Sequence, residues 1–383
     1  MIIEITDQQR EVQAMAREFA AREIAPHSAE WNERHHVPVE VLLRMGELGL
    51  LGIVVPEEHG GAGMDHVTLC LVMEEIAAAD AGLSTGLAVQ NGLGPEPLLR
   101  WGTREQRERW LPEMASGRRF VSYALTEPDA GSDVAGIKTT GTRQPDGAFL
   151  VSGTKMWITG GGYASVFMLF ARTEGPGARG ISAFIAEPGP GFTVGRELPK
   201  MGLHSSSTVE LAFEDYRIEG DAMLGDPGQG MQIALSALDG GRVTVAAQAV
   251  GIARAALEVA TRYATERTAF GGPIARFQGI QFPIADVAAK IDAARLLTLH
   301  AACLQDRGEP VAEAGAKAKL FASAVAVEAA NVAVQTLGGY GFSAEFPAER
   351  LYRDAKITEI YEGTSQIQRM VIARSLLGDA ARG

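Results

Sequence analysis

Apolar residues recur every three or four positions through the first part of the chain, which is the spacing of amphipathic helices. The sequences TDQQ at residues 6–9 and TREQ at residues 103–106 both have the pattern of a capping box, which starts a helix. Between them, the Ala-rich apolar stretch 67–79 suits a buried helix. The pattern therefore predicts an N-terminal helical domain over residues 1–117.

Helical spacing disappears between residues 118 and 226. Short runs rich in Val, Ile, Phe and Thr alternate there with Gly and Pro clusters, as strands alternate with turns. The sequence Pro145-Asp146-Gly147 between two such runs is typical of a hairpin turn. We expect this middle domain to form a small antiparallel barrel or sandwich. The predicted strands include residues 149–152, 166–171, 181–186 and 209–213.

Long Ala-rich helical patterns return after residue 226, and their lengths suit antiparallel helices packed as a bundle. They cover residues 231–265, 278–306 and 311–337. The order of helical, β and helical regions predicts an α+β protein. Its three expected domains are an N-terminal helical domain (1–117), a central antiparallel β barrel or sandwich (118–226) and a C-terminal four-helix bundle (227–383).

Composition mainly excludes certain partners and kinds of site. The 383 residues carry a formal net charge of −12, which argues against a nucleic-acid partner because phosphate backbones need a basic surface. An anionic small ligand held by a few local cations stays compatible with this balance. The seven histidines show no metal-binding spacing, so we predict no metal. Cys70 and Cys303 both lie in apolar sequence, which favours buried free thiols over a disulfide.

The N-terminal sequence MIIEITDQQREV leads directly into the first predicted helix. It has no basic start, apolar core or cleavage site of the kind that marks a signal peptide. We also expect no apolar run to reach membrane-spanning length. A cytoplasmic protein of bacterial style, without a membrane partner, is therefore our expectation.

Two segments of the middle region could contact a flat cofactor. Residues 123–136 join a predicted strand to a Gly-containing loop with hydroxyls and backbone donors, which could pair with the polar edge of a heterocycle. In residues 155–161, Trp157 and Thr159 alternate with Ile158 along a strand, so an indole and a hydroxyl face the same side. Each segment also has a simpler interpretation, a turn between strands and a tryptophan in the core.

Glycines and a loop carboxylate mark the C-terminal region. Gly338 and Gly339 follow a long predicted helix and permit close approach of a pyrophosphate, although they could simply end the helix. Glu362 lies in a loop before an apolar helix that Thr364 and Ser365 can cap, and such a helix N-terminus suits an anion or cofactor. A solvated charge and an ordinary cap would explain the same residues.

Together and in this order, the segments resemble those of the acyl-CoA dehydrogenase family of flavoenzymes. Residues 124–136 match the front signature of the family at its fixed positions, and residues 335–354 resemble the rear signature. The sequences Trp157-Ile158-Thr159 and YEGT at residues 361–364 are further matches. The resemblance covers essentially the whole chain and the α–β–α order, and so implies the fold of this family.

The resemblance implies FAD as the cofactor, bound between the β domain and the C-terminal helices. The residues that it assigns to FAD in the same subunit are Tyr123, Leu125, Thr126, Ser132, Trp157, Ile158, Thr159, Thr364 and Gln366. Tetramers of the family share FAD across a dimer interface, which implies a homotetramer built as a dimer of dimers. The residues that would complete the site of a neighbouring subunit are Arg267, Phe270, Gln278, Gln335, Gly338 and Gly339.

Glu362 matches the catalytic base of the family. The implied reaction is α,β-dehydrogenation of an acyl-CoA to the trans-2-enoyl-CoA, with the α-proton passing to Glu362, a hydride to flavin N5 and the electrons to electron-transfer flavoprotein. Because a thioester α-proton is weakly acidic, the base must be desolvated, and we expect the pKa of Glu362 to rise toward neutrality when an acyl chain closes the site. Gly241 stands where a few members carry an alternative Glu, so Glu362 has no evident rival.

The resemblance also implies substrate contacts. Asp239, Arg242 and Ser132 match positions beside the pantetheine arm, although an ion pair inside the bundle would equally explain Arg242. Ser84 stands where glutaryl-CoA members carry an Arg, so we do not expect a dicarboxylate. The glycine pair at 240–241 resembles short-chain and short branched-chain members, which favours a short- or medium-chain acyl-CoA. The further pocket residues implied are Leu87, Val89, Gln90, Gly241, Tyr361 and Gly363.

Two alternatives stay open at this point. An acyl-CoA oxidase or another flavin oxidase on the same scaffold is possible because oxygen access cannot be read from the sequence. A non-catalytic helical assembly protein is the second alternative, and the presence of Glu362, Trp157 and Arg267 argues against it. The choice between fatty-acid and branched-chain amino-acid catabolism is not decided by the sequence.

Overall fold

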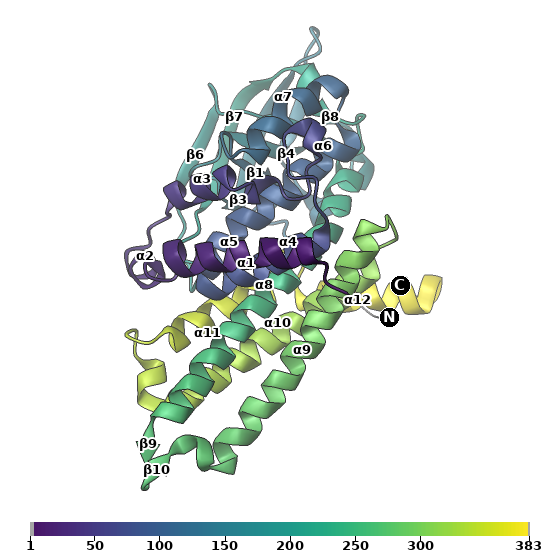
Figure 1. The fold of residues 1–383 in the computed structure, drawn as a ribbon. Helices are drawn as coiled ribbons and strands as arrows, with labels where there is room; N and C mark the ends of the chain where they lie inside the picture. The colour runs from purple at the N-terminus through teal and green to yellow at the C-terminus, as the bar shows by residue number, and fades with distance from the viewer. Residues whose placement is uncertain (1–3, 382–383) are drawn as a thin grey trace.

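The computed structural model describes residues 4–381, in which helices come first, strands follow and helices return (Figure 1). Both predicted capping boxes are confirmed, because Thr6 and Thr103 exchange side-chain and main-chain hydrogen bonds with Gln9 and Gln106. The N-terminal α-helices are α1 (Asp7–Phe19), α2 (Ser28–Arg34), α3 (Val39–Glu47), α4 (His66–Ala79), α5 (Ala81–Ala88), α6 (Pro95–Trp101) and α7 (Arg104–Ala115). A π-helical segment, η4 (Val89–Leu93), continues α5.

The middle region forms one eight-stranded sheet with the order β6-β7-β3-β2-β4-β5-β8, and β1 pairs with β4. The strands are β1 (Val121–Ala124), β2 (Thr140–Arg143), β3 (Phe149–Thr159), β4 (Val166–Arg172), β5 (Ile181–Ala186), β6 (Phe192–Glu197), β7 (Thr208–Ile218) and β8 (Met223–Leu224). Most pairs are antiparallel, as predicted. The pairs β1–β4 and β2–β4 are parallel. Strand β3 runs antiparallel to β2 and carries the chain back before β4 begins, so β4 runs in the same direction as β2.

Both faces of this sheet are apolar. On one face, the ring of Phe192 in β6 lies 4.9 Å from the ring of Phe167 in β4, although three strands separate β6 from β4 in the sheet order. The sheet therefore folds over itself, which confirms the central β domain that was predicted as a barrel or sandwich, although its edge strands β6 and β8 do not pair with each other within the described chain. Met168 and Phe170 point to the other face and pack with Trp110 of α7 and the beginning of the first long helix.

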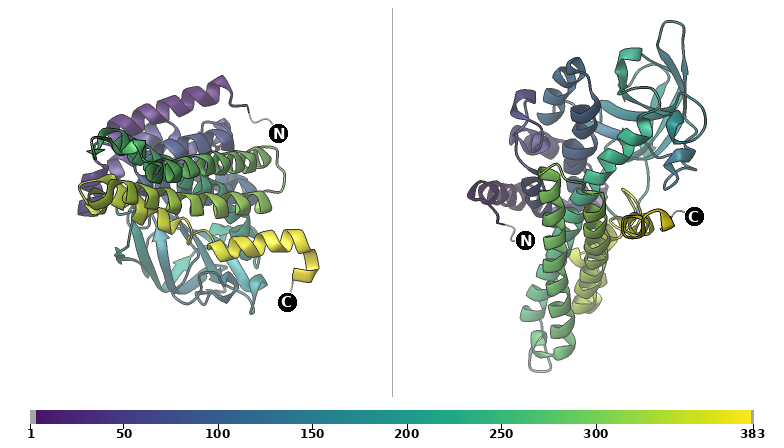
Figure 2. Two further views of the ribbon diagram at one scale, coloured as in Figure 1. Left: turned by 90° about the horizontal axis from the view of Figure 1, so that it is seen from below. Right: turned by 90° about the vertical axis from the view of Figure 1, so that its right-hand side faces the viewer.

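The C-terminal region is dominated by three long helices, α8 (Gly230–Glu266), α9 (Gln278–Asp306) and α10 (Ala312–Leu337), which lie side by side (Figures 1 and 2). The short hairpin of β9 (Thr268–Ala269) and β10 (Gly272–Pro273) with η8 (Ile274–Arg276) joins α8 to α9. The segment η9 (Gly338–Phe342) leads to α11 (Pro347–Ile357), and α12 (Ser365–Leu377) with η10 (Gly378–Ala381) ends the described chain. In Figure 2, α8 runs from the sheet into the bundle.

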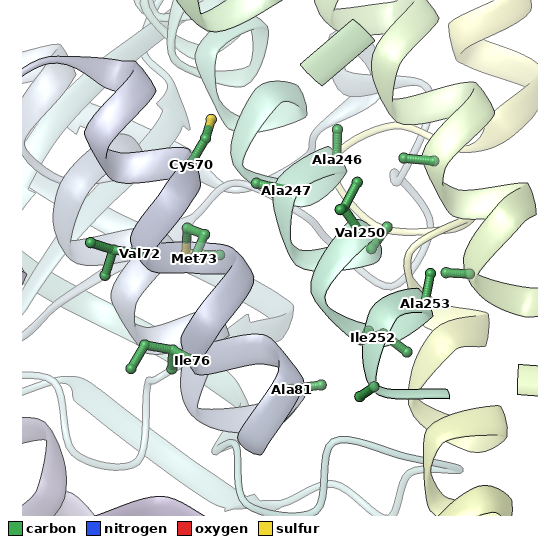
Figure 3. Close-up of a cluster of buried hydrophobic side chains, with 14 of the residues drawn as sticks. Cys70, Val72, Met73, Ile76, Ala81, Ala246, Ala247, Val250, Ile252 and Ala253 are labelled. Carbon is green, nitrogen blue, oxygen red and sulfur yellow. The ribbon is translucent and has the colours of Figure 1, made fainter. Parts of the chain in front are cut away.

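Small side chains let α4 lie close against α8. Val72, Met73 and Ile76 of α4 belong to the same core cluster as Ala247 and Val250 of α8 (Figure 3). The two backbones are so close that a Cβ atom at Gly251 of α8 would lie 2.6 Å from the carbonyl oxygen of Glu74 in α4, whereas Val72 and Ile76 point away from α8 in Figure 3. This contact joins the N-terminal helices to the bundle.

Buried ion pairs reinforce the same junction. Glu75 of α4 binds Arg17 of α1 at 2.9 Å and Arg254 of α8 at 2.7 Å. Its neighbour Glu74 binds Arg295 of α9 at 2.8 Å. Both carboxylates are buried while their arginine partners are partly exposed, and Glu75 keeps a second arginine if one is removed. The cluster therefore fixes how the N-terminal helices sit on the bundle.

Two helices are more apolar than the sequence led us to expect. The segments 230–266 and 312–342 each contain a window with a mean hydropathy of 1.4, enough by length and composition to cross a membrane. The expectation that no apolar run reaches this length was therefore wrong. In the structure, 83% and 50% of these windows are buried, and α8 and α10 pack against each other. Packing inside the bundle accounts for their apolar character.

Candidate functional site

The loop between α11 and α12 makes a tight left-handed turn at Glu362. Its φ is 51°, and Gly363 follows with a φ of 95°. Left-handed backbone is uncommon for a residue with a side chain and costs of order 1 kcal/mol or more. Thr364 then caps α12, because its hydroxyl accepts a hydrogen bond from the N–H of Ile367 at 3.3 Å. The turn and the cap together fix where the Glu362 side chain begins.

Side chains of two helices hold this turn. Lys319 of α10 donates from Nζ to the carbonyl oxygens of Thr358 and Gly363, at 2.9 and 2.8 Å. Ser323, one turn further along α10, donates to the same Thr358 oxygen at 2.8 Å. Gln368 of α12 donates to Gly363 O at 2.8 Å. The strained conformation is therefore stabilised from both sides.

The Glu362 carboxylate lies directly against α8. A Cβ atom at position 241 would be only 2.0 Å from Glu362 Oε2, so the glycine at this position provides the space for the carboxylate. Glu362 Oε2 is buried and has no hydrogen-bond partner. Burial raises the pKa of Glu362 to about 7, and the positive charges of Lys319 and Arg242 oppose a larger rise. Such a carboxyl group can act as a general base near neutral pH.

A groove of about 530 Å³ runs along the first turns of α8. One side is formed by the α8 face that carries Gln232, Leu235 and Asp239, spaced as one face of a helix, and Arg179 from η6 (Ala178–Gly180) lines the other. The groove ends at Asp239, which pairs with Arg242 at 2.6 Å. Arg242 also acts on the Glu362 carboxylate, which lies against Gly241, so the groove and the carboxylate occupy the same stretch of α8.

Sequence reasoning identified Asp239 but missed Arg179, Gln232 and Leu235. Stepping back from Asp239 by four and seven residues along the helix would have found Leu235 and Gln232. No local pattern indicates Arg179, because it reaches the groove from a loop of the β region.

Trp157 lies at a bulge of β3, where the pairing with β7 shifts between Lys155 and Ile158. Its φ is 62°, and its side chain is 54% exposed, while Thr159 is half-buried. The two residues are thus both accessible, as the alternation predicts. Ile158 is buried in the barrel core, so its side chain cannot reach a cofactor, and the assignment of this side chain to FAD needs correction.

A buried ion pair fixes the neighbouring loop. Lys155, which is fully buried, donates from Nζ to Glu127 Oε1 at 2.8 Å and to the carbonyl oxygen of Leu125 at 3.1 Å. The main-chain N–H of Met156 donates to Thr126 O at 2.9 Å. The loop that carries Leu125 and Thr126 is therefore tied to the strand that carries Trp157. Tyr123 precedes this loop and donates its hydroxyl to Ala234 O of α8 at 3.2 Å.

Models of three consecutive domains match this chain. The acyl-CoA dehydrogenase N-terminal domain matches residues 6–118, the middle domain 122–216 and the C-terminal domain 228–377. The chain belongs to the acyl-CoA dehydrogenase family. The resemblance in sequence is thereby confirmed, and with it the enzyme class, an oxidoreductase.

Relatives and solved structures match nearly the whole chain. The mitochondrial short-chain specific acyl-CoA dehydrogenase of Bos taurus is 45% identical over 98% of this chain and 91% of its own. Butyryl-CoA dehydrogenase from Megasphaera elsdenii superposes with a TM-score of 0.97 at 41% identity, covering 98% and 100% of the two chains. A chain from a structural study of the electron transferring flavoprotein of Acidaminococcus fermentans has a TM-score of 0.97 at 44% identity over 99% and 100%.

The acyl-CoA dehydrogenase family binds FAD. An acyl-CoA dehydrogenase from Bacillus anthracis complexed with FAD matches with a TM-score of 0.93 and 34% identity, over 99% of this chain and 68% of that chain. In the acyl-CoA dehydrogenase described here, Thr364 caps α12 and Gln366 is exposed in its first turn. Ser132 is exposed on the loop after Tyr123. These residues are accessible to a ligand.

The second group of residues assigned to FAD lies at the far end of the bundle. Arg267 and Phe270 follow the end of α8, and the guanidinium of Arg267 lies 5.8 Å from the centre of the Tyr340 ring. At about 1.5 Å per residue, α8 separates Arg267 from Gly241 by about 40 Å. The acyl-CoA dehydrogenase chain alone therefore does not bring this group to Glu362. The exposed residues of the group are Arg267, Phe270, Gln278, Gln335, Gly338 and Gly339.

The expected pocket residues differ in their surroundings. Leu87 is part of the main apolar core. The amide of Gln90 donates to Val121 O at 3.0 Å and accepts from Val121 N at 3.4 Å, so it ties η4 to β1 and is not free for a substrate. Gln248 was missed by the sequence reasoning, although it contacts Tyr361 directly through the tyrosine hydroxyl. The signal in the sequence that could have indicated Gln248 was a glutamine within an otherwise apolar, Ala-rich helical pattern.

Proposed function

We propose that this protein catalyses the FAD-dependent α,β-dehydrogenation of short-chain acyl-CoA thioesters to trans-2-enoyl-CoA. The observation that carries the proposal is the Glu362 carboxylate, whose Oε2 atom is buried and unpartnered and which lies on a strained turn against Gly241 of α8. Its pKa of about 7 suits proton abstraction at neutral pH. A carboxylate kept only for stability would have its oxygens hydrogen-bonded.

The residues of the chain fit an FAD molecule. The exposed indole of Trp157 offers a flat apolar face beside the hydroxyls of Thr159 and Thr126, which suits one side and one edge of an isoalloxazine ring. The N-terminus of the 13-residue helix α12, with Thr364 as its cap and Gln366 exposed, suits the phosphate-bearing half. When bound, FAD would accept a hydride from the substrate Cβ at N5 and pass the electrons to an electron-transfer flavoprotein.

The protein's own part of the reaction is proton removal and orientation. Glu362 would take the α-proton, and Gly241 keeps the space in which the carboxylate reaches it. Within the described chain, the Glu362 N–H donates to no acceptor, so it is available to the thioester oxygen as negative charge develops there. The Glu362 Oε2 atom is buried, which keeps water away from the base.

The groove along α8 suits the coenzyme A moiety. Arg179 could bind phosphate oxygens through its guanidinium, because this planar group matches them in pairs. Leu235, an exposed apolar residue on the groove wall, offers a surface to the pantetheine arm. Asp239, fixed by Arg242, is a hydrogen-bond acceptor at the end of the groove.

A buried polar group supports a short acyl chain. Gln248 lies two helical turns beyond Gly241 on α8, about 10 Å further along the axis. Its amide donates to Ser84 Oγ at 2.8 Å and to Ala81 O at 2.9 Å, and its oxygen accepts the hydroxyl of Tyr361. An apolar chain that reached this network would have to break it or leave polar groups unpaired.

We also propose that the working form is a homotetramer in the cytoplasm, with domains at residues 1–117, 118–226 and 227–383. In support, Phe270 and Phe342 near the far end of the bundle are 89% and 86% exposed, as expected of residues that a second copy covers. Arg267 and its neighbours would then complete the FAD site of that copy.

A series of acyl-CoAs tests this function. Anaerobic mixing of the purified yellow holoenzyme with butyryl-, octanoyl- and palmitoyl-CoA should bleach the flavin fastest with the four-carbon substrate. Glu362→Gln should bind FAD and acyl-CoA normally but fail to bleach. Bleaching by this variant at a rate near that of the wild type would exclude Glu362 as the base. Reoxidation in air as fast as by an electron-transfer flavoprotein would instead indicate an oxidase.

A further inference from the structure

Lys319 is a buried cation beside the Glu362 turn that the reaction outlined above does not use. Its side chain is fully buried, and both of its hydrogen-bond acceptors are neutral carbonyl oxygens, those of Thr358 and Gly363. Burying an ammonium group without a carboxylate partner is costly, so such a lysine is rarely kept for stability alone. The two acceptors bracket Glu362 in the sequence, one before it and one after it.

We propose that Lys319 is a positioning residue for Glu362: its ammonium group fixes the main chain of the turn, and its positive charge keeps the neighbouring carboxyl group ionised at neutral pH. This inference rests on the proposed role of Glu362 as the base. It adds a second element to that role, because proton affinity and position of the base would both depend on one side chain of α10.

The geometry supports the positional part. Glu362 is left-handed, so its side chain keeps its direction only while the residues on both sides are held. Lys319 connects Thr358 and Gly363 through a single nitrogen atom. Ser323 reaches only Thr358, so among the α10 side chains only Lys319 bonds both ends of the turn.

The charges around the site support the electrostatic part. The groups that act on Glu362 are Lys319 of α10 and Arg242 of α8, and both oppose the rise in the pKa of Glu362 that burial causes. Arg242 is partly neutralised because it pairs with Asp239 at 2.6 Å. Among the described residues, Lys319 pairs with no carboxylate. Its charge lowers the pKa of Glu362 more than the charge of Arg242 does. Burial lowers the pKa of Lys319 itself to about 8, so this group is charged at pH 7.

The remaining titratable neighbours do not replace this charge. Tyr123 of β1 and Tyr361 of the same loop face Glu362, and burial raises the pKa of both hydroxyls well above the usual value. Both are therefore neutral throughout the pH range in which Glu362 titrates. Glu359 acts on Lys319 and favours its charged form.

The test uses the pH dependence of kcat/KM for butyryl-CoA in the FAD-loaded enzyme, which reports the ionisation of the free enzyme. Lys319→Met removes the charge and both hydrogen bonds. The acid limb of the profile should move upward by about one pH unit, the smaller end of the shift that an opposite charge produces at close range. At pH 7 this shift lowers kcat/KM several-fold, in addition to any loss caused by misplacement of the Glu362 carboxylate.

Two matched variants separate charge from support. Ser323→Ala removes a hydrogen bond to the same Thr358 oxygen without removing a charge, and Lys319→Arg keeps the charge while disturbing the geometry. Both should leave the acid limb where it is in the wild type, whatever happens to the rate. Lys319→Gln, which keeps donors but lacks the charge, should move the limb as Lys319→Met does, and it serves if the Met variant does not fold.

The outcomes are distinguishable. An acid limb that stays in place in Lys319→Met or Lys319→Gln, with FAD still bound, would overturn the electrostatic role and leave Lys319 as a structural support. A limb that moves equally in Ser323→Ala would overturn it as well. If Glu362→Gln, measured in parallel, keeps its activity, the proposed function fails independently of Lys319.

Discussion

Substituting alanine for Gly241 should inactivate the enzyme without unfolding it. A Cβ atom at this position would lie 2.0 Å from Glu362 Oε2 and 3.0 Å from its Cδ, whereas ordinary contact begins at 3.4 Å. The carboxylate must therefore move by more than about 1 Å. The turn that carries it is held by Lys319 and Gln368, so the side chain rather than the backbone has to move.

The size of the effect follows from this displacement. Moving a reacting group by about 1 Å from its productive position costs about 100-fold in rate, equivalent to about 2.7 kcal/mol. Stability should change in the opposite direction, because alanine in a helix interior is favoured over glycine by about 0.5–1 kcal/mol. Gly241→Ala should thus keep or raise its melting temperature while flavin reduction slows by at least about 100-fold.

Gly240→Ala is the matched control. It introduces the same methyl group one residue earlier in the same helix, but its Cβ would meet the flexible ends of Glu96 and Gln305, at 2.8 Å each. We expect it to gain the same helix stability and to keep its activity within a few-fold. The assay is anaerobic stopped-flow bleaching of the flavin by butyryl-CoA, together with thermal unfolding. Full activity in Gly241→Ala, or equal losses in both variants, would refute the assignment of this space to the Glu362 carboxylate.

Four further outcomes are expected. Burial raises the pKa of Glu362 to about 7, so the wild type loses stability as this group ionises between about pH 4.5 and 7. Glu362→Gln cannot ionise, so its melting temperature relative to the wild type should rise over this range and show no advantage below about pH 4.5, as measured by calorimetry. Arg179→Ala should raise KM for butyryl-CoA about tenfold with kcat unchanged, and a truncated thioester without the nucleotide should show no such effect in steady-state assays. Gln248→Ala should shift the ratio of kcat/KM values from butyryl- toward octanoyl-CoA, because it removes the polar group that meets Tyr361, and an unchanged ratio would argue against a polar end to the pocket. Phe270→Ser should shift sedimentation toward smaller species and lower the FAD content together, since the exposed ring is expected to lie between copies.

Local patterns in the sequence predicted the elements well. The capping boxes at Thr6 and Thr103, the hairpin at Gly147 and the long helices depend on residues close in the chain, and the structure confirms each of them. The family resemblance added the chemistry, because several short motifs far apart in the chain agree with one another. None of these signals required knowledge of the three-dimensional contacts.

Features that depend on contacts between distant segments could not be predicted in the same way. No local pattern indicates that Lys155 and Lys319 are buried, yet both are fully buried with partners far away along the chain. Arg179 joins the groove only because a loop of the β region folds over α8. The parallel pairing of β1 with β4 likewise follows from the path of the chain.

Backbone strain connects the site to partners outside the chain. Among residues 4–381, six non-glycine residues have a left-handed φ, and three of them are Trp157, Phe270 and Glu362, which the family resemblance assigns to cofactor or catalysis. Such strain costs about 1–3 kcal/mol per residue and persists where surrounding contacts fix the conformation. For Glu362 these contacts come from Lys319 and Gln368. The side chains of Trp157 and Phe270 are 54% and 89% exposed, so the chain alone buries neither ring. Under the proposed function, the isoalloxazine ring would cover Trp157 and a second subunit would cover Phe270.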